Sequence, residues 1–386
     1  MQHHTYLASK PRYEVLDGLR GVASLMVVAF HLFETYSAGP RYQIINHGYL
    51  AVDFFFVLSG FVIGYAYDDR WGRMSLGDFF KRRLVRLHPM VIMGTLIGAL
   101  LFYLGACDAF PLVSQTPWWM MLLLLLLGCT MLPAPVSWDI RGWAETNSLD
   151  GPTWSLLYEY IANLLYALFI RHFSKWLLAL FVIAAACLTI DLTMNLDLFR
   201  LFSAQRTDTA YTVIGGWSLT PDQIYVGFTR LLYPFFMGLL LSRMGKLIRM
   251  RRGGFWWCSL LIVVMLAMPR LGGGEAMWMN GAYEAFCILL MFPLVVLMGA
   301  GSTLKGKRSI AVCTFLGEIS YPLYITHYPL IYMHIAWAKQ HPDAPLSTVV
   351  CLSVSLFIFA IGIAYASLKL YDLPVRDWLK RHWLMR

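Results

Sequence analysis

Long apolar stretches separated by short polar loops dominate the sequence. A helix that crosses a hydrocarbon core of about 30 Å needs roughly 20 mostly apolar residues, and many stretches come close to that length. They lie near residues 18–37, 48–66, 84–105, 153–170, 176–192, 224–242, 255–271, 282–300, 312–337 and 347–370. The pattern predicts an all-α polytopic membrane protein with about ten transmembrane helices.

The short loops that carry Lys and Arg predict the orientation of these helices, because positively charged loops stay in the cytoplasm. Basic residues gather at residues 10–20, 70–86, 243–252, 305–308 and 376–386. Both termini are therefore predicted to be cytoplasmic, and the number of spans to be even. An eleventh apolar run, residues 118–131, is too short to fit this scheme as a span. It is predicted to be a re-entrant or interfacial segment.

The amino-acid composition excludes several classes of protein. The chain is 59% hydrophobic and 14% charged, which is unusual for a water-soluble protein. The basic residues that give the net charge of +9 lie at the predicted membrane edges. We therefore expect membrane lipid around the chain and no nucleic-acid partner. The seven cysteines show no close pair of the kind that builds a zinc site, and no metal is expected. No repeat or linker is visible, so residues 1–386 are predicted to form one transmembrane domain.

His31 lies well inside the first predicted span, where an ionisable side chain is costly unless it is paired or faces water. Arg20 precedes it by eleven residues, which is close to three helical turns. The two side chains therefore share one helix face, with the guanidinium at the cytoplasmic edge and the imidazole deeper. The alternatives are a helix-packing hydrogen bond for His31 and a snorkelling anchor for Arg20.

A second basic group, Arg82, Arg83 and Arg86, opens the third predicted span. Arg83 and Arg86 are three residues apart and meet on one side of a helix. Forked guanidinium donors bind phosphate in bidentate fashion, so the cluster favours a phosphate-bearing ligand on the cytoplasmic side. The alternative is a cluster that only fixes membrane topology.

Further ionisable groups interrupt other spans. Asp53 lies among aromatic residues of the second span, and Glu159 lies two turns into the fourth. His327 follows Pro322, which should kink its helix. Each is a candidate site residue, because buried charge in a membrane requires a partner or a function.

Taken together, these motifs resemble the acyltransferase-3 family of bacterial membrane O-acyltransferases. The resemblance runs from about residue 13 to residue 378 and rests on six pieces in the family's order. They are residues 16–21 with the Arg20 to His31 spacing, residues 52–61, the Arg83 and Arg86 pair, residues 154–159, residues 320–327 and residues 372–374.

The resemblance implies a multi-pass protein of the bacterial inner membrane and an acyl-CoA donor on the cytoplasmic side. It also implies carbohydrate or lipid-linked acceptors and frequent transfer of an acetyl group. Acyl-CoA would be a co-substrate, and no bound cofactor is expected. His31, Arg20, Arg83 and Arg86 are marked as functional residues.

The predicted mechanism places CoA phosphates on Arg20, Arg82, Arg83 and Arg86, with the thioester near His31. His31 would act as general base on an acceptor hydroxyl or would itself carry the acyl group. Glu34, one turn away, or Asp53 would orient the imidazole. The remaining candidates are assigned to the acceptor side or to support: Ser59, Trp154, Ser155, Glu159 and His327.

A proton-coupled secondary transporter of an anionic solute is the rival interpretation. In it, His31, Asp53, Glu159 and His327 form a proton relay and the arginines bind the solute. The two repeated halves that are typical of such transporters are not visible in the sequence. A non-catalytic scaffold would leave the buried ionisable groups unexplained.

Overall fold

The computed structural model describes residues 10–39, 42–200, 209–250 and 253–384. These residues are helical, with two isolated β-bridges and no β-strand, which confirms the all-α prediction for the described part of the chain. The helices are α1 (Glu14–Glu34), α2 (Ala51–Tyr67), α3 (Leu76–Leu101), α4 (Trp118–Thr130), α5 (Thr153–Leu168), α6 (Lys175–Thr193), α7 (Pro221–Met244), α8 (Gly254–Ala267), α9 (Trp278–Phe286), α10 (Phe292–Ala300), α11 (Lys307–Gln340), α12 (Leu346–Ser367) and α13 (Leu373–Leu379).

Two pairs of helices run on through π-helical turns. Cys287–Met291 joins α9 to α10, and Leu368–Asp372 joins α12 to α13. Each of the ten predicted spans coincides with a helix or with one of these joined pairs. Seven helices in the described residues are long and apolar enough to cross a membrane. Helices α5, α8 and α11 fall outside that group, so the count of ten stays a prediction.

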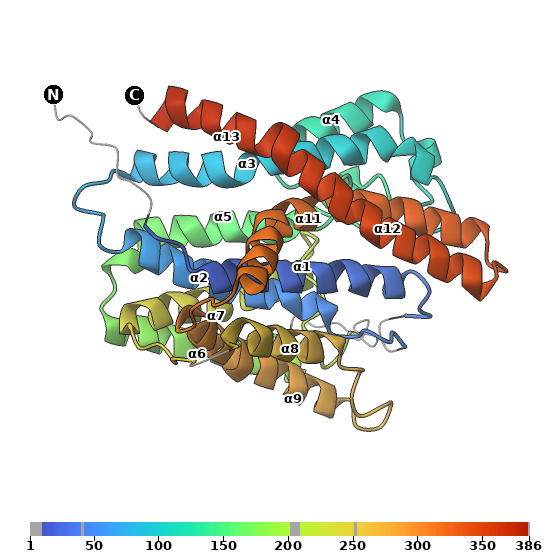
Figure 1. Cartoon of the computed structure of the whole chain (residues 1–386). Coiled ribbons are helices and arrows are strands. Elements are labelled where there is room, and N and C mark those ends of the chain that lie inside the picture. Colours follow the sequence, from blue (N-terminus) through green and yellow to red (C-terminus); the bar gives the residue numbers. More distant parts are fainter. Residues whose placement is uncertain (1–9, 40–41, 201–208, 251–252, 385–386) are drawn as a thin grey trace.

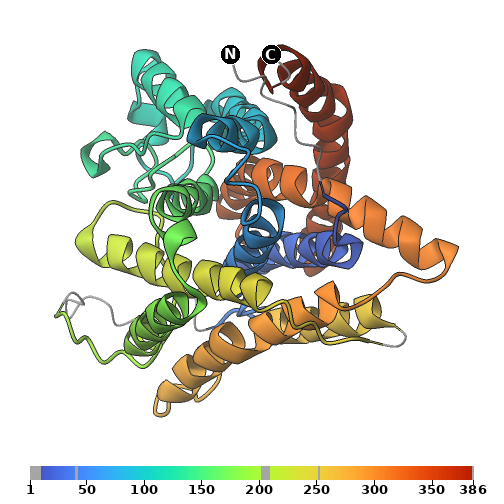
Figure 2. The same cartoon turned by 90° about the vertical axis from the view of Figure 1, so that its left-hand side faces the viewer.

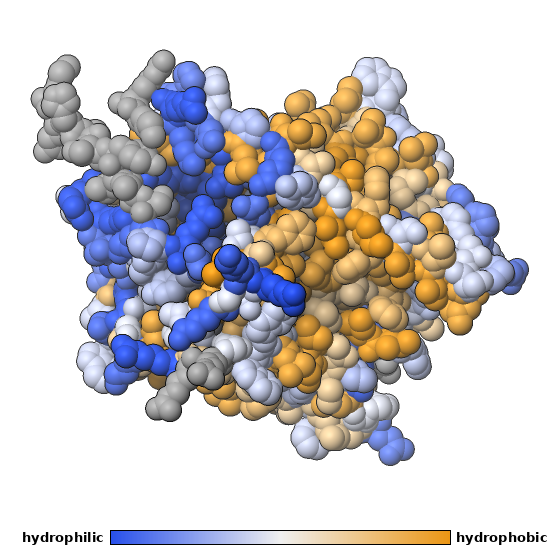
Figure 3. Space-filling model, viewed as in Figure 1, coloured by the Kyte–Doolittle hydropathy of each residue, from blue (hydrophilic) through white to orange (hydrophobic). Residues whose placement is uncertain are grey.

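The long helices lie roughly parallel, and the first turn of α1 and the end of α13 lie at the same end of the bundle (Figure 1). Hydrophilic residues cover this end, which we call the basic end, and apolar residues cover most of the remaining visible surface (Figure 3). That distribution suits a chain whose flanks face lipid. The side of the membrane that the basic end faces stays a prediction.

Helices α1 and α2 lie in the middle of the bundle, where α1 packs chiefly on α11 and α2 on α7 (Figure 2). The contact between α2 and α7 depends on glycine. A Cβ on Gly60 would collide with the backbone oxygen of Phe235, and one on Gly238 with that of Val57. Small residues allow membrane helices to approach this closely.

Local signals explain where several helices begin and end. Ser75 and Asp78 form a capping box at the start of α3, and Gly245 ends α7 in the left-handed conformation. Helix α4, the predicted re-entrant segment, has thirteen residues and packs on α3. Its mode of membrane insertion stays a prediction.

Candidate active site

A cavity of about 720 Å³ occupies the basic end of the bundle. Its walls come from α1, α2, α3, α5, α11 and the joined helices α12 and α13. Segments far apart in the sequence therefore form one chamber. Its volume lies within the range of small-molecule sites, which is about 300–1,000 Å³.

Five arginines of the described residues line this cavity: Arg12 from the segment before α1, Arg20 from α1, Arg83 and Arg86 from α3, and Arg376 from α13. Arg86 is half-buried, and it is repelled by Arg20, Arg83 and Arg376 and attracted by Asp17. It has no hydrogen bond or ion pair with the described residues. An anionic ligand would relieve this repulsion, and phosphate oxygens match guanidinium geometry.

Three of the other cavity arginines each contact an acid. Arg83 Nη2 bonds Glu159 Oε1 at 2.5 Å, Arg376 Nη1 bonds Asp372 Oδ2 at 2.9 Å, and Arg20 lies 3.5 Å from Asp17.

Three of the residues assigned to the acceptor side lie in the walls of this same cavity. Ser59 donates a hydrogen bond to Glu159, which also holds Arg83, and Ser155 lies at the inner end. The structure thus brings them together with the predicted donor-binding arginines. Arg82, by contrast, is not among the described residues that line the cavity.

A pair of hydroxyl groups lines the cavity between α5 and α11. The hydroxyls of Ser155 and Tyr324 are 2.7 Å apart, and the ring of Phe55 packs edge-on against Tyr324 with centroids 5.4 Å apart. On α1 the lining reaches Ser24, which bonds the backbone oxygen of Ser320. Neither His31 nor His327 lines the chamber in this state.

Two histidines outside the cavity lining face each other. The rings of His31 and His327 stack with centroids 5.5 Å apart, and the edge of Tyr328 packs against both. His31 Nδ1 lies 2.7 Å from Glu34 Oε2. A carboxylate at that distance fixes the Nδ1–H tautomer and leaves Nε2 free to accept a proton.

Asp53, the other predicted orienting carboxylate, contacts a different group. It is fully buried and forms an ion pair with Arg230, whose Nη2 lies 2.8 Å from Asp53 Oδ2. The Arg230 guanidinium also lies over the ring of Trp154 and bonds the backbone oxygen of Tyr49. Asp53 and Trp154 therefore belong to a packing cluster, and Glu34 is the carboxylate that contacts His31.

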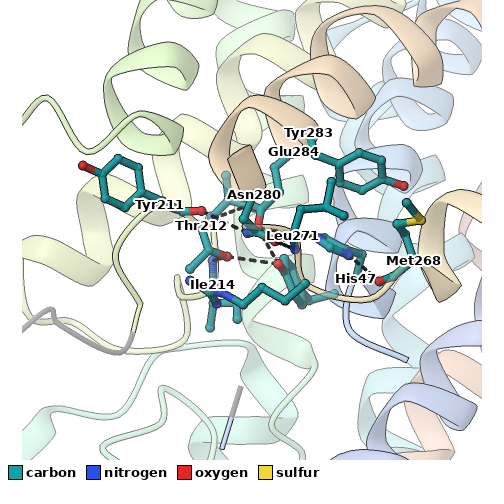
Figure 4. A network of polar contacts seen from close by, with 12 residues as sticks. His47, Tyr211, Thr212, Ile214, Met268, Leu271, Asn280, Tyr283 and Glu284 are labelled. Atoms are coloured by element: carbon teal, nitrogen blue, oxygen red, sulfur yellow. Dashed lines mark hydrogen bonds and ion pairs between the residues drawn. The ribbon is translucent and has the colours of Figure 1, made fainter. Parts of the chain in front are cut away.

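A buried polar network joins residues 47–49, the 209–217 loop and α9 (Figure 4). Glu284 accepts hydrogen bonds from Tyr49 Oη at 2.5 Å, from Asn280 Nδ2 at 2.7 Å and from the backbone N–H of Val213 at 2.7 Å. His47 lies 3.0 Å from Asn280 Oδ1. The carboxylate is thus fully engaged in holding the 209–217 loop against α9.

The loop that precedes α5 contacts the tyrosines of α11 that follow His327. Tyr332 packs against Tyr328 and donates a hydrogen bond to Glu145. Burial raises the pKa of Glu145 to about 7, against the lowering effect of Arg141. The pKa of Asp150 is also raised, well above its ordinary value, because the side chain is buried beside Glu145.

Sequence reasoning missed several of these residues. Arg230 and Glu284 fall inside predicted spans, so the rule that buried ionisable groups need partners could have found them. Arg376 was assigned to the basic tail, and only the return of α13 onto α3 places it in the cavity. Nothing in the sequence distinguishes Tyr324 from other aromatic residues of α11. In the described ranges, no group of three His, Cys, Asp or Glu side chains could hold a metal ion.

Comparisons with known proteins agree with the resemblance. The sequence model of a family described as an acyltransferase domain matches residues 13–367. Acyltransferase MdmB of Streptomyces mycarofaciens is 24% identical over 92% of this chain and 90% of its own length. Protein 2 in the picA locus of Rhizobium radiobacter is 33% identical over 40% of this chain and 81% of its own length.

Peptidoglycan O-acetyltransferase OatA of Listeria monocytogenes is 25% identical over 82% of this chain. The match spans about half of OatA, 49% of its length. No solved structure matches the chain significantly. Because the family match covers nearly all of the sequence, the chain belongs to the acyltransferase-3 family and is an acyltransferase.

Proposed function

We propose that this protein is a membrane O-acyltransferase that moves an acyl group, expected to be acetyl, from cytoplasmic acyl-CoA to a hydroxyl of a carbohydrate or lipid-linked glycan. The observation that carries the proposal is Arg86, which has no hydrogen bond or ion pair with the described residues and lines a cavity with four further arginines, near two stacked histidines. Arginines at one place and histidines at another suit an acyl donor such as acyl-CoA, in which the phosphates lie far from the reactive thioester.

The donor would enter from the basic end, which we propose faces the cytoplasm of a bacterial inner membrane. Arg20, Arg83, Arg86 and Arg376 would hold the phosphates, because each guanidinium offers several donors in a fixed fork. The pantetheine arm would then run along α1 and α11 toward Tyr324. CoA acts here as a co-substrate, so the protein needs no bound cofactor.

The acceptor class is inferred from relatives. OatA of Listeria monocytogenes is named a peptidoglycan O-acetyltransferase, which supports a carbohydrate hydroxyl as the acceptor. His31 lies in the last turn of α1, far from the basic end, and Glu34 beside it is exposed. An acceptor approaching from the outer side would therefore meet His31 first.

His31 would act as the general base. Its Nε2 takes the proton of the acceptor hydroxyl while the oxygen attacks the acyl carbon. With loss of the CoA thiolate and return of that proton to solvent, the products are the ester and free CoA. Glu34 stabilises the transient imidazolium, and such base catalysis contributes about 10² to 10⁴ in rate.

The transporter interpretation fits the geometry less well. Asp53 and Glu159 are held in ion pairs with Arg230 and Arg83, so neither continues a proton relay from His31. Family membership also favours acyl transfer.

Release of CoA from acetyl-CoA by the purified protein in detergent tests the proposal. We expect release to depend on an added sugar or glycan acceptor and to be accompanied by acetylation of that acceptor, detected by mass spectrometry. Absence of acceptor acetylation across a panel of glycans extracted from the host envelope would contradict it, especially if proteoliposomes accumulated an anionic solute instead.

A further inference from the structure

The donor cavity ends nearer to His327 than to His31. On α11 the lining reaches Tyr324, three residues before His327, which is about 5 Å of helical rise. On α1 the lining stops at Ser24, seven residues before His31, which is about 10 Å. A thioester that passed the Tyr324 hydroxyl would therefore reach the His327 imidazole first.

His327 presents an unengaged lone pair. Its Nδ1 lies 2.9 Å from the backbone oxygen of Tyr324 and 3.1 Å from that of Leu323. Carbonyl oxygens only accept, so Nδ1 carries the proton and Nε2 is the unprotonated nitrogen. The side chain is fully buried, and Nε2 has no hydrogen-bond partner among the described residues. A buried polar atom without a partner is unusual and calls for an explanation.

His31 occupies a different environment. Its side chain is 17% exposed and it contacts Glu34, which is 44% exposed. Among the described residues, the hydrogen-bond partners of His327 are backbone carbonyls, and aromatic rings pack beside it. A carboxylate can stabilise an imidazolium, while a carbonyl pair holds a neutral ring in place. The two stacked rings are thus suited to different tasks.

We propose that His327 is the acyl carrier and that His31 is the base that discharges it. The proposal rests on the function proposed above. His327 Nε2 attacks the thioester carbonyl, the carbon–sulfur bond breaks, and CoA leaves as the thiolate. The acylated ring keeps its Nδ1 proton, which is hydrogen-bonded to the backbone carbonyls, and so carries one positive charge that balances the thiolate. His31 Nε2 then removes the acceptor's proton as its oxygen attacks the acyl carbon. The bond to His327 breaks, which restores the neutral ring, and His31 returns its proton to solvent, where it balances the thiolate.

The stacking distance supports this division of labour. With ring centroids 5.5 Å apart, the two imidazoles are near enough for a base on one ring to act on an acceptor hydroxyl that attacks an acyl group on the other. His327 thereby separates the donor cavity from the outer-facing base. The acyl group can cross to the acceptor side while the bulky donor stays in its chamber.

Incubation with radiolabelled acetyl-CoA, without acceptor, tests the proposal. We expect a burst of about one equivalent of free CoA per protein and hydroxylamine-sensitive label on the peptide that contains His327. His31→Gln should keep the burst and the label but lose transfer to an acceptor. His327→Asn should lose both, because its amide N–H can still bond the backbone carbonyls while no nucleophilic nitrogen remains.

His334→Asn is the matched control, since His334 is also buried on α11 but packs against Tyr36 and Ser353; it should keep the burst. Calorimetry of CoA binding verifies that each variant is folded. Label on His31, a burst that survives in folded His327→Asn, or wild-type turnover with no burst and no label would each overturn the proposal. Failure of His31→Gln to lose transfer would instead count against the proposed function.

Discussion

Replacing Arg86 by Gln should weaken CoA binding without harming the fold. Arg86 forms no ion pair with the described residues, and its removal ends its repulsion with Arg20, Arg83 and Arg376, which the attraction of Asp17 only partly offsets. Loss of the charged hydrogen bonds from one guanidinium costs about 1.5–3 kcal/mol of binding free energy, which is roughly 10- to 150-fold in Kd. The stability of the free protein should be unchanged or slightly higher.

Isothermal titration calorimetry with CoA, paired with thermal unfolding in the same detergent, measures both effects. Arg82→Gln is the matched control, because Arg82 belongs to the same basic cluster but does not line the cavity; it should bind CoA normally. Arg83→Gln differs from both, since it strips Glu159 of its ion-pair partner and should lower stability as well. Unchanged affinity of Arg86→Gln, or an equal loss in Arg82→Gln, would refute the assignment of the donor site.

Three further expectations follow from the packing and from the loop that precedes α5. Asp53→Asn leaves Arg230 as an uncompensated buried charge, so the free energy of unfolding should fall by about 3–5 kcal/mol in a denaturation assay. Gly60→Ala forces α2 and α7 apart and should reduce the yield of folded protein on size-exclusion chromatography, whereas Gly362→Ala, with open space around it, should not. The pKa of Glu145 is raised from 4.5 to about 7, so its stabilising contribution is present below pH 4.5 and lost as pH rises through 7. The apparent melting temperature should therefore fall over that range, and Glu145→Gln should show a smaller fall; equal slopes would contradict the burial of this acid.

Much of the architecture could be predicted from the sequence because lipid imposes simple rules. Each predicted span coincides with a helix, since a long apolar run in a membrane has few other ways to satisfy its backbone. The Arg20 to His31 spacing placed both residues on α1, with the arginine at the cavity. The pairing of Arg83 and Arg86 on one face of α3 also followed from helical geometry alone.

The pairing of side chains between helices could not be predicted in this way. Asp53 and Arg230 are 177 residues apart, and only the packing of α2 on α7 brings them together. The same holds for Arg83 and Glu159. The sequence predicts Arg83 in the donor site and Glu159 on the acceptor side or in support, yet the two side chains form an ion pair. The presence of Arg376 in the cavity depends on where α13 returns. Helical periodicity determines which residues share one face of a helix. It does not determine which neighbouring helix that face contacts.

Transfer of labelled acetyl from acetyl-CoA to a glycan acceptor by wild type and His31→Gln, with CoA affinity measured on the same samples, tests the assignment of His31 most directly. We expect the variant to lose transfer by at least about 10² to 10⁴, while its CoA affinity stays near that of wild type because His31 does not line the donor cavity. Near-normal transfer by a folded His31→Gln protein would contradict the role of His31 as the base.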